Sequence, residues 1–408
     1  MSVRVRFAPA PSGDLHVGGA MVAVANDLLR RRDGGALVLR IDDTDAGETA
    51  AGAEAAIADA LAWLGIAVDE GPLRQSARAD AHRALADELV AAGAAVRLDD
   101  GAVALPAVER DVVIDDLSRG PIRLPAGAIA RTVLVRADGR PTFHLATACD
   151  DRDLAITHVL RGEDHIANTA VQLVLAEAGG FAAPAFAHLP IAVGADGAKL
   201  SSSDGAPGIA ALRAAGFLPE AVVDWLARSA CPPLTALPAA GADALARAFD
   251  PSRLGHGTTR LDPQLLESLG RDHLAQLEAA ERAARVAAWL GDGADAAAVA
   301  ILAPGLTDAP TLAAAAELVR GILEPPSLRE PSEADRAAAE ALLAALPAAP
   351  DPLDADAAAA LIDALGCGKR PVRRVLTAAD SGIPLPFVLA ALPRDAALAR
   401  ARAVLDQP

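Results

Sequence analysis

Residues 3–45 have the sequence VRVRFAPAPSGDLHVGGAMVAVANDLLRRRDGGALVLRIDDTD, and this stretch decides the fold. Val3, Val5 and Phe7 alternate with polar residues and predict a short strand. A turn rich in Pro and Gly follows over residues 8–13. The strand therefore leads directly into a tight turn.

A helix is predicted to begin near Val17, and one of its faces carries the apolar residues Val17, Met21, Val24 and Leu28. Gly34 and Gly35 stop it after a basic last turn, as glycines do at helix C-termini. Residues 36–41 then form a second buried strand. The whole stretch predicts a β-α-β unit of an α/β protein.

Polar residues follow both predicted strands, over 8–19 and over 42–45. Because ligands of open α/β sheets bind beyond the carboxyl ends of the strands, both clusters are expected at one site. His16 at the helix start, with Gly18 and Gly19, predicts a nest of backbone N–H groups that cradles phosphates. His16 is also placed to stabilise charge that develops on a phosphate.

A second candidate for phosphate binding is the loop GAKLSSSDG at residues 197–205. Its lysine and serines suit the grip on a triphosphate. Taken alone, such a loop is more often a solvated turn, and a glycine-rich turn after a strand is structural about as often as functional. Only the two motifs together indicate a site for phosphates.

Composition excludes several classes of protein. The chain has 408 residues, 52% of them hydrophobic and 22% charged, which allows two to four domains with buried cores and excludes wholesale disorder. The formal net charge of −17 argues against a protein that coats nucleic acid in general. From Gly366 onward, however, seven Lys/Arg stand against three Asp, a local excess of four positive charges that suits a face for one RNA.

Neither a membrane segment nor a secretion signal is predicted. The longest uncharged run, residues 178–195, contains three Gly and two Pro, and the N-terminus has no apolar core for a signal. Cys149, Cys231 and Cys367 lie far apart, which predicts buried thiols rather than a zinc knuckle or a disulfide framework. We expect a soluble, cytoplasmic protein with no membrane partner.

Further elements are expected along the chain: helices over 52–64 and 77–93, short strands over 95–140, strand and loop character over 143–169, a helix over 168–178, and an almost wholly helical region after 208 with a linker at 324–331.

Five separated blocks occur in a known family order: FAPAPSGDLHVGGA, LRIDDTD, DEGPLRQS, THVLRGEDHIANT and KLSSSDG. Together they resemble glutamyl-tRNA synthetase, a class I aminoacyl-tRNA synthetase. The resemblance is close over 3–98 and 112–230, and it returns at RPVRRVLTAADSGIPLPFVLAAL (370–392), which looks like the end of an anticodon-binding domain.

The resemblance implies a glutamate site. Arg6 matches the residue that holds the α-carboxylate, Asp42 the one that takes the α-ammonium, and Arg161 the one that faces the side-chain carboxylate. A guanidinium fork pairs with a carboxylate on two bonds and leaves an amide mismatched, so Arg161 favours glutamate over glutamine. Ala10 and Phe143 also belong to this site, where Ser and Tyr are usual, and each removes one hydroxyl.

The resemblance also implies ATP binding, with Mg²⁺ held mainly through the phosphates, by Pro11, His16, Gly18, Gly19, Lys199, Ser201 and Ser202. Three of these, His16, Lys199 and Ser202, match catalytic positions, and Ser202 stands where a second lysine is usual. No zinc is expected, because the segment that carries cysteines in some members is absent. The histidines His144, His158, His165 and His188 are expected to be structural.

The implied fold is α/β, with a Rossmann-type parallel sheet in the catalytic domain (1–98 and 141–235), a shortened acceptor-stem-binding insertion (99–140), a helical stem-contact region (236–290) and an all-α anticodon-binding domain (291–408). Basic residues of the last domain are expected to contact tRNA phosphates: Lys369, Arg370, Arg373 and Arg374. A solvated helix face is the alternative for them.

The implied activity is ATP-dependent ligation of L-glutamate to tRNA(Glu) through a glutamyl-adenylate, by a monomer, with tRNA(Gln) left open as a second substrate. Two alternatives remain open at this point: glutamylation of a modified tRNA base, and a catalytically weakened tRNA-binding or regulatory paralogue. About 170 residues follow the insertion-bearing half, which argues against the first alternative.

Overall fold

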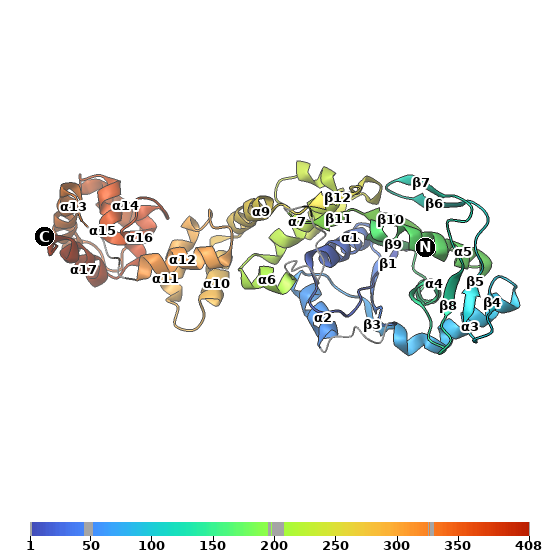
Figure 1. Cartoon of the computed structure of the whole chain (residues 1–408). Helices are drawn as coiled ribbons and strands as arrows, with labels where there is room; N and C mark the ends of the chain where they lie inside the picture. Colours follow the sequence, from blue (N-terminus) through green and yellow to red (C-terminus); the bar gives the residue numbers. More distant parts are fainter. Residues whose placement is uncertain are drawn as a thin grey trace. The chain divides into compact units, whose positions relative to one another are not determined.

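The computed structural model describes residues 2–44, 52–194, 197, 208–324, 326 and 330–407. The chain divides into two compact units (Figure 1). Unit 1 comprises Met1–Arg213 and Pro219–Pro263, and unit 2 comprises Ala214–Leu218 and Gln264–Pro408. The sheets lie in unit 1, whereas unit 2 is built from helices.

The N-terminal β-α-β unit is confirmed. Strands β1 (Arg4–Phe7), β2 (Ala36–Ile41) and β3 (Glu70–Arg74) pair in parallel, and helix α1 (Val17–Asp33) connects the first two. Gly34 ends α1 in the left-handed conformation, with φ 63°. A Cβ on Gly35 would lie 2.2 Å from the backbone oxygen of Val3, so the helix returns to the sheet only through a glycine.

A second sheet has the order β7-β6-β10-β9 and adjoins the first, with β9 (His158–Gly162) beside β1 (Figure 1). The backbone N–H of Thr157 donates to the carbonyl of Arg4 over 2.9 Å. Strand β10 (Ala185–Leu189) pairs in parallel with β9. The chain therefore adds strands outward on one side from β1 and on the other side from β9. Ligands of such sheets bind at this switch point in the strand order.

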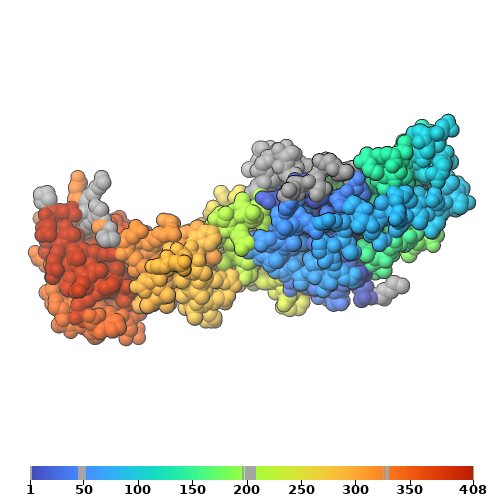
Figure 2. Space-filling model, turned by 90° about the horizontal axis from the view of Figure 1, so that it is seen from below, coloured from blue at the N-terminus to red at the C-terminus, as the bar shows by residue number. Residues whose placement is uncertain are grey.

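The segment predicted as an insertion contributes to both this sheet and one of its own. Strands β4 (Val96–Arg97), β5 (Val103–Leu105) and β8 (Thr132–Val135) form a small antiparallel sheet. The hairpin of β6 (Val112–Asp116) and β7 (Gly120–Leu124) instead extends the catalytic sheet, where Asp116 pairs with Phe186. In Figure 2, helices α2 and α3 and the strands after them form a continuous blue-to-cyan surface of unit 1.

One expectation about secondary structure is wrong. Residues 143–153 form helix α4 (Phe143–Asp153) rather than strand and loop. Its buried Leu145, Ala148 and Cys149 lie on one helical face and pack in the core with Leu85 and Leu175. The polar half of the segment hid this period, because Asp150 and Asp151 are themselves buried.

The other helices of unit 1 follow the predicted pattern: α2 (Ala53–Trp63), α3 (Ala79–Ala91), α5 (Ile166–Ala178), α6 (Ile209–Ala214), α7 (Pro219–Ala230) and α8 (Ala242–Ala248). Two short strands, β11 (Ile191–Val193) and β12 (Thr258–Arg260), pair in parallel.

Unit 2 contains helices α9 (Pro263–Gln276), α10 (Ala279–Leu290), α11 (Ala296–Leu302), α12 (Leu312–Leu323), α13 (Glu333–Ala345), α14 (Ala355–Ala364), α15 (Lys369–Thr377), α16 (Leu385–Ala391) and α17 (Arg394–Leu405). The predicted linker at 324–331 falls between α12 and α13. No helix among the described residues is long and apolar enough to cross a membrane.

Candidate active site

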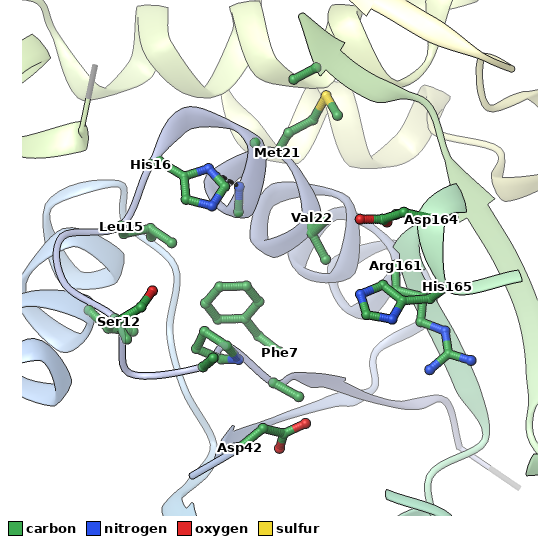
Figure 3. A pocket seen from close by; sticks show the side chains of 18 of the residues that line it. Phe7, Ser12, Leu15, His16, Met21, Val22, Asp42, Arg161, Asp164 and His165 are labelled. Atoms are coloured by element: carbon green, nitrogen blue, oxygen red, sulfur yellow. Dashed lines mark hydrogen bonds between the residues drawn. The ribbon is translucent and has the colours of Figure 1, made fainter. Parts of the chain in front are cut away.

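A cavity of about 350 Å³ opens at the switch point of the sheet. Its walls come from β1 and the turn after it, the N-terminal part of α1, the carboxyl ends of β2 and β9, and residues 190–192 after β10 (Figure 3). The predicted site residues that line it are Arg6, Ala10, His16, Gly18, Gly19, Asp42, Phe143 and Arg161. The structure therefore brings together residues predicted from separate motifs.

The N-terminus of α1 forms one wall. His16 is the N-cap, and its Nδ1 accepts a hydrogen bond from the backbone N–H of Gly19 over 3.2 Å (Figure 3). A Cβ on Gly19 would lie 3.0 Å from Leu15 Cδ1 and 3.8 Å from two atoms of the His16 ring. The absence of a side chain at Gly19 thus keeps room beside His16 at the positive end of the helix dipole.

Arg161, near the end of β9, lies on the opposite side of the cavity from His16 (Figure 3). Its Nη2 donates to Thr169 Oγ1 over 2.7 Å and to Gln172 Oε1 over 2.8 Å. Its Cζ lies 5.5 Å from the centre of the Phe186 ring. The remaining nitrogens, Nε and Nη1, are buried without a hydrogen-bond partner among the described residues.

The charge of Arg161 is not neutralised nearby. It forms no ion pair with any carboxylate in the described part of the chain, and burial together with the charge of Arg6 lowers its pKa to about 9. Arginine nevertheless keeps its proton at neutral pH. A buried, unpaired guanidinium with two free N–H groups is a strong site for an anion, above all for a carboxylate.

Two arginines on β1 and β2 share a carboxylate from α4. Arg40 Nη1 donates to Asp151 Oδ1 over 2.6 Å, and Arg6 Nε lies 3.4 Å from the same oxygen. Arg40 Nε also donates to Asp42 Oδ1 over 2.7 Å. Burial raises the pKa of Asp42 against the attraction of Arg40.

Sequence reasoning missed Arg40 and Asp151 as parts of this site. Arg40 was detectable, because it is the one charged residue in the apolar strand 36–41 and stands at its carboxyl end. Asp151 carried no such signal, since its segment was expected to be strand and loop. Their ion pair spans 111 positions of the chain, a link that motif spacing does not reveal.

Comparison with known proteins identifies the family. The model of class I tRNA synthetases (E and Q), catalytic domain, matches residues 2–107 and 103–267. The chain belongs to this synthetase family. It is 41% identical over 283 residues to glutamate–tRNA ligase 1 of Rubrobacter xylanophilus and 38% identical over 310 residues to glutamate–tRNA ligase 2 of Maricaulis maris. These alignments cover 68% and 67% of this chain but only 65% and 64% of the relatives' lengths.

Solved structures share the synthetase fold. A crystal structure of a glutamate tRNA ligase from Elizabethkingia meningosepticum, in complex with its amino acid, superposes with a TM-score of 0.84 at 23% identity. Glutamate-tRNA synthetase from Elizabethkingia anophelis superposes with a TM-score of 0.83 at 23% identity. Each match covers 100% of both chains. The α/β fold with a parallel-sheet catalytic domain and a helical C-terminal region is therefore confirmed.

Two synthetase positions that depart from the usual residues, Ala10 and Phe143, both line the cavity. Pro11 is buried between the lining residues of the turn but does not itself line the cavity. His165 does, although it was expected to be structural, and burial together with nearby Arg161 lowers its pKa to about 4. A neutral imidazole therefore forms part of the wall at neutral pH.

Lys199, Ser201 and Ser202, which are predicted to belong to a second nucleotide loop, lie outside the described residues. Before this segment, Ile191 and Ala192 line the cavity, and after it Gly208 pairs with His16 in a β-bridge.

The predicted tRNA-binding residues lie on α15 or at its start and already have partners. Lys369 Nζ lies 3.1 Å from Asp363, Arg370 Nε 2.9 Å from Asp380, and Arg374 Nε 3.1 Å from Asp335. Arg373 Nη1 instead donates to the carbonyl of Ile383 over 2.8 Å. The side chains of Lys369 and Arg370 are 72% and 71% exposed, so these two are the accessible cations of the helix.

One buried cluster in unit 1 has metal-ligating side chains, namely His82, Cys149 and Asp150, with ligand atoms within 4.8 Å of one another. Burial raises the pKa of the Cys149 thiol to about 12, whereas a metal needs the thiolate. Asp150 is already bonded to His82 over 2.8 Å and to Arg78 over 2.7 Å. The cluster is a hydrogen-bonded part of the core. Cys149 and Cys231 are buried as predicted, whereas Cys367, also predicted to be buried, is only partly buried.

Proposed function

We propose that the chain is a glutamate–tRNA ligase, which joins L-glutamate to tRNA(Glu) at the expense of ATP. One observation carries the proposal: Arg161 presents two unbonded, buried N–H groups at a cavity whose other wall is the N-terminus of α1. This pairs a carboxylate site with a phosphate site. The names of the relatives, glutamate–tRNA ligase, support the same activity.

In this proposal the amino acid lies between three charged side chains. Arg161 takes the side-chain carboxylate, Arg6 the α-carboxylate and Asp42 the α-ammonium. Glutamine places an amide against Arg161, which leaves a buried N–H facing another N–H. An unsatisfied buried group costs about 1–3 kcal/mol or more, which favours glutamate by about tenfold to a hundredfold.

Glutamate activation proceeds by substitution at phosphorus. An α-carboxylate oxygen of glutamate attacks the α-phosphorus of ATP, the bond to the β-phosphate breaks, and pyrophosphate leaves with Mg²⁺ that entered on the phosphates. His16, the N–H groups of α1 and the loop with Lys199, Ser201 and Ser202 stabilise the charge on the phosphates. Both nucleophiles belong to substrates, so the protein acts by positioning and electrostatics.

In the second step, a terminal ribose hydroxyl of tRNA attacks the carbonyl carbon of the adenylate and AMP leaves. We assign residues 99–140 to the acceptor stem, 236–290 to stem contact and 291–408 to the anticodon. One chain suffices, because the described residues that line the cavity all come from unit 1. A role in translation places the reaction in the cytoplasm.

Two assays test the proposal. Purified protein is expected to exchange labelled pyrophosphate into ATP with glutamate, with and without tRNA, and to attach glutamate to an unmodified tRNA(Glu) transcript. Parallel reactions with tRNA(Gln) decide whether it is a second substrate. Attachment only to modified native tRNA would indicate a base-modifying enzyme instead, and no attachment to any tRNA would overturn the ligase proposal.

A further inference from the structure

A chain of buried polar side chains lies behind Arg161. Thr169 Oγ1, which accepts from Arg161, lies 2.9 Å from His188 Nε2. His188 Nδ1 in turn lies 2.6 Å from Asp116 Oδ2. Asp116, His188 and Thr169 are all buried, and the reaction steps described above use none of them.

The carboxylate at one end holds the orientation of the His188 ring. Burial opposes the charge of Asp116, but hydrogen bonds from His188 and Ser118 lower its pKa below the ordinary value, so it is an acceptor at neutral pH. His188 Nδ1–H donates to it, which turns Nε2 of the same ring towards Thr169 Oγ1. The Thr169 oxygen accepts from Arg161 Nη2, and its hydroxyl also bonds the backbone carbonyl of His165 over 3.2 Å.

The same side chains hold the plane of the guanidinium. The rings of Phe186 and His188 are stacked at 6.3 Å with an interplanar angle of 6°, and Phe186 in turn lies under the Arg161 guanidinium. Gln172 provides the second acceptor for Nη2. With Nη2 fixed on the far side, Nε and Nη1 remain for a ligand in the cavity.

Asp116 also connects this series of buried side chains to the predicted acceptor-stem insertion. It closes strand β6, and its Oδ1 accepts from the backbone N–H groups of Ser118 and Arg119 over 2.9 and 3.0 Å. The carboxylate therefore uses one oxygen to hold the turn after β6 and the other to orient His188. A residue of the insertion thus reaches the amino acid pocket through two side chains.

We propose that Asp116, His188 and Thr169 are positioning residues that orient Arg161 and so set the preference for glutamate over glutamine. This inference rests on the proposed function, because it takes the ligand of Arg161 to be the side-chain carboxylate of glutamate. A charge-assisted bond to the ligand carboxylate requires the unbonded N–H groups to point at its oxygens, and a guanidinium free to rotate loses this geometry.

Thr169→Val removes the central hydroxyl with little change of volume, and Thr169→Ser keeps it. In pyrophosphate exchange, Thr169→Val is expected to raise KM for glutamate about tenfold, as the loss of a hydrogen bond to a charged group implies. The kcat and the KM for ATP are expected to change less than about twofold, and the ratio of kcat/KM for glutamate over glutamine to fall. Thr169→Ser is expected to restore all of these values to within about twofold.

His82→Gln is the matched control for His188→Gln, because His82 is an equally buried histidine paired with an aspartate but has no bond to Arg161. Both changes are expected to lower the melting temperature, but only His188→Gln is expected to lower the glutamate preference. If Thr169→Val and His188→Gln leave the KM for glutamate and that preference unchanged, the inference is overturned.

Glutamate binding measured by calorimetry separates this inference from the proposed function. A wild-type chain that binds glutamate but does not activate it contradicts the ligase activity alone, and weaker binding by Thr169→Val would still support positioning. In the Arg161→Ala background, Thr169→Val is expected to have no further effect on binding. A full additional loss there would show that Thr169 acts on the ligand or the fold directly, which also overturns the inference.

Discussion

Three buried arginines define the chemistry of unit 1 at the residue scale. Arg6, Arg40 and Arg161 lie on three parallel strands, and each is at most 5% exposed. Burial of a charge costs several kcal/mol unless a partner offsets it. Asp151 is that partner for Arg6 and Arg40, whereas the described residues offer no carboxylate to Arg161. Arg161 is therefore held ready for a ligand carboxylate.

Arg161→Ala is expected to raise KM for glutamate at least a hundredfold and to change KM for glutamine only a few-fold, because only the carboxylate uses the full charge. Arg161→Lys keeps the charge without the planar fork and is expected to recover only part of the loss. Pyrophosphate exchange with each amino acid measures both. Equal losses for glutamate and glutamine would mean that Arg161 serves the fold and not the choice of substrate.

Lys199 is expected to provide the positive charge of the predicted second nucleotide loop. Ser202 stands where a second lysine is usual in glutamyl-tRNA synthetases. Lys199→Ala is expected to lower the single-turnover rate of adenylate formation far more than Ser202→Ala, because a charge-assisted bond is about twice as strong as a neutral one. Ser202→Lys is expected to maintain or raise the rate. The reverse order would mean that another cation serves the phosphates.

At the scale of elements, helix α1 serves both the fold and the site. Its N-terminus borders the cavity, and its C-terminus returns the chain to β2 through Gly34. The two ends can therefore be tested separately by the same substitution, glycine to alanine.

Gly19→Ala is expected to raise KM for ATP several-fold, because the new Cβ presses on Leu15 and on the His16 ring. The free energy of unfolding is expected to change by less than about 1 kcal/mol, since alanine favours helix. Gly34→Ala, the control, is expected to cost about 1–2 kcal/mol at φ 63° and to leave KM for ATP unchanged. An unchanged KM in Gly19→Ala would argue against phosphates at this end of α1.

The capping box of α13 makes unit 2 sensitive to acid. Burial opposes the charge of Asp335, but bonds from Ser332 and Arg374 lower its pKa below the ordinary value of about 4. A lowered folded pKa stabilises the native state above the unfolded pKa, and that stability is lost as pH falls through the folded pKa. Asp335→Asn is expected to cost about 1–3 kcal/mol at pH 7 and to flatten the pH dependence of unfolding below pH 4. If Asp335→Asn loses as much stability below pH 4 as the wild type does, other carboxylates cause that loss of stability.

For the molecule as a whole, the net charge of −17 opposes binding to any polyanion. The attraction to tRNA that the proposed function requires must therefore come from local cations. The ion pairs of Lys369 and Arg370 with Asp363 and Asp380 are exposed, and exposed pairs contribute little to stability. Both side chains can therefore leave their aspartates and bind phosphates with little loss of folding free energy.

Replacement of Lys369 and Arg370 together by Gln is expected to weaken tRNA binding and to reduce the slope of log Kd against log salt by about 1–2. Arg320→Gln on α12, which removes a 43% exposed arginine paired with Glu317, is the control and is expected to leave the slope unchanged. Filter binding at several salt concentrations measures the slope. A slope equal to that of the wild type would indicate that α15 is a solvated face.

The sequence by itself determined the β-α-β unit and the residues next to it. The helical period from Val17, the glycines at its end and the apolar run 36–41 are local signals, and the structure has the helix at Val17–Asp33 and the strand at Ala36–Ile41. Local patterns are reliable because they reflect the geometry of one segment. Eight of the residues that line the cavity were also predicted as site residues.

Only the tertiary structure decided how distant segments meet. The residues of the pairs Arg40–Asp151 and Asp116–His188 lie 111 and 72 positions apart, and helix 143–153 buries Asp150 and Asp151 through packing that no local pattern indicates. The unbonded N–H groups of Arg161 also exist only because folding removes them from water. Spacing along a chain carries no information on such contacts, since burial and partners depend on which faces pack together.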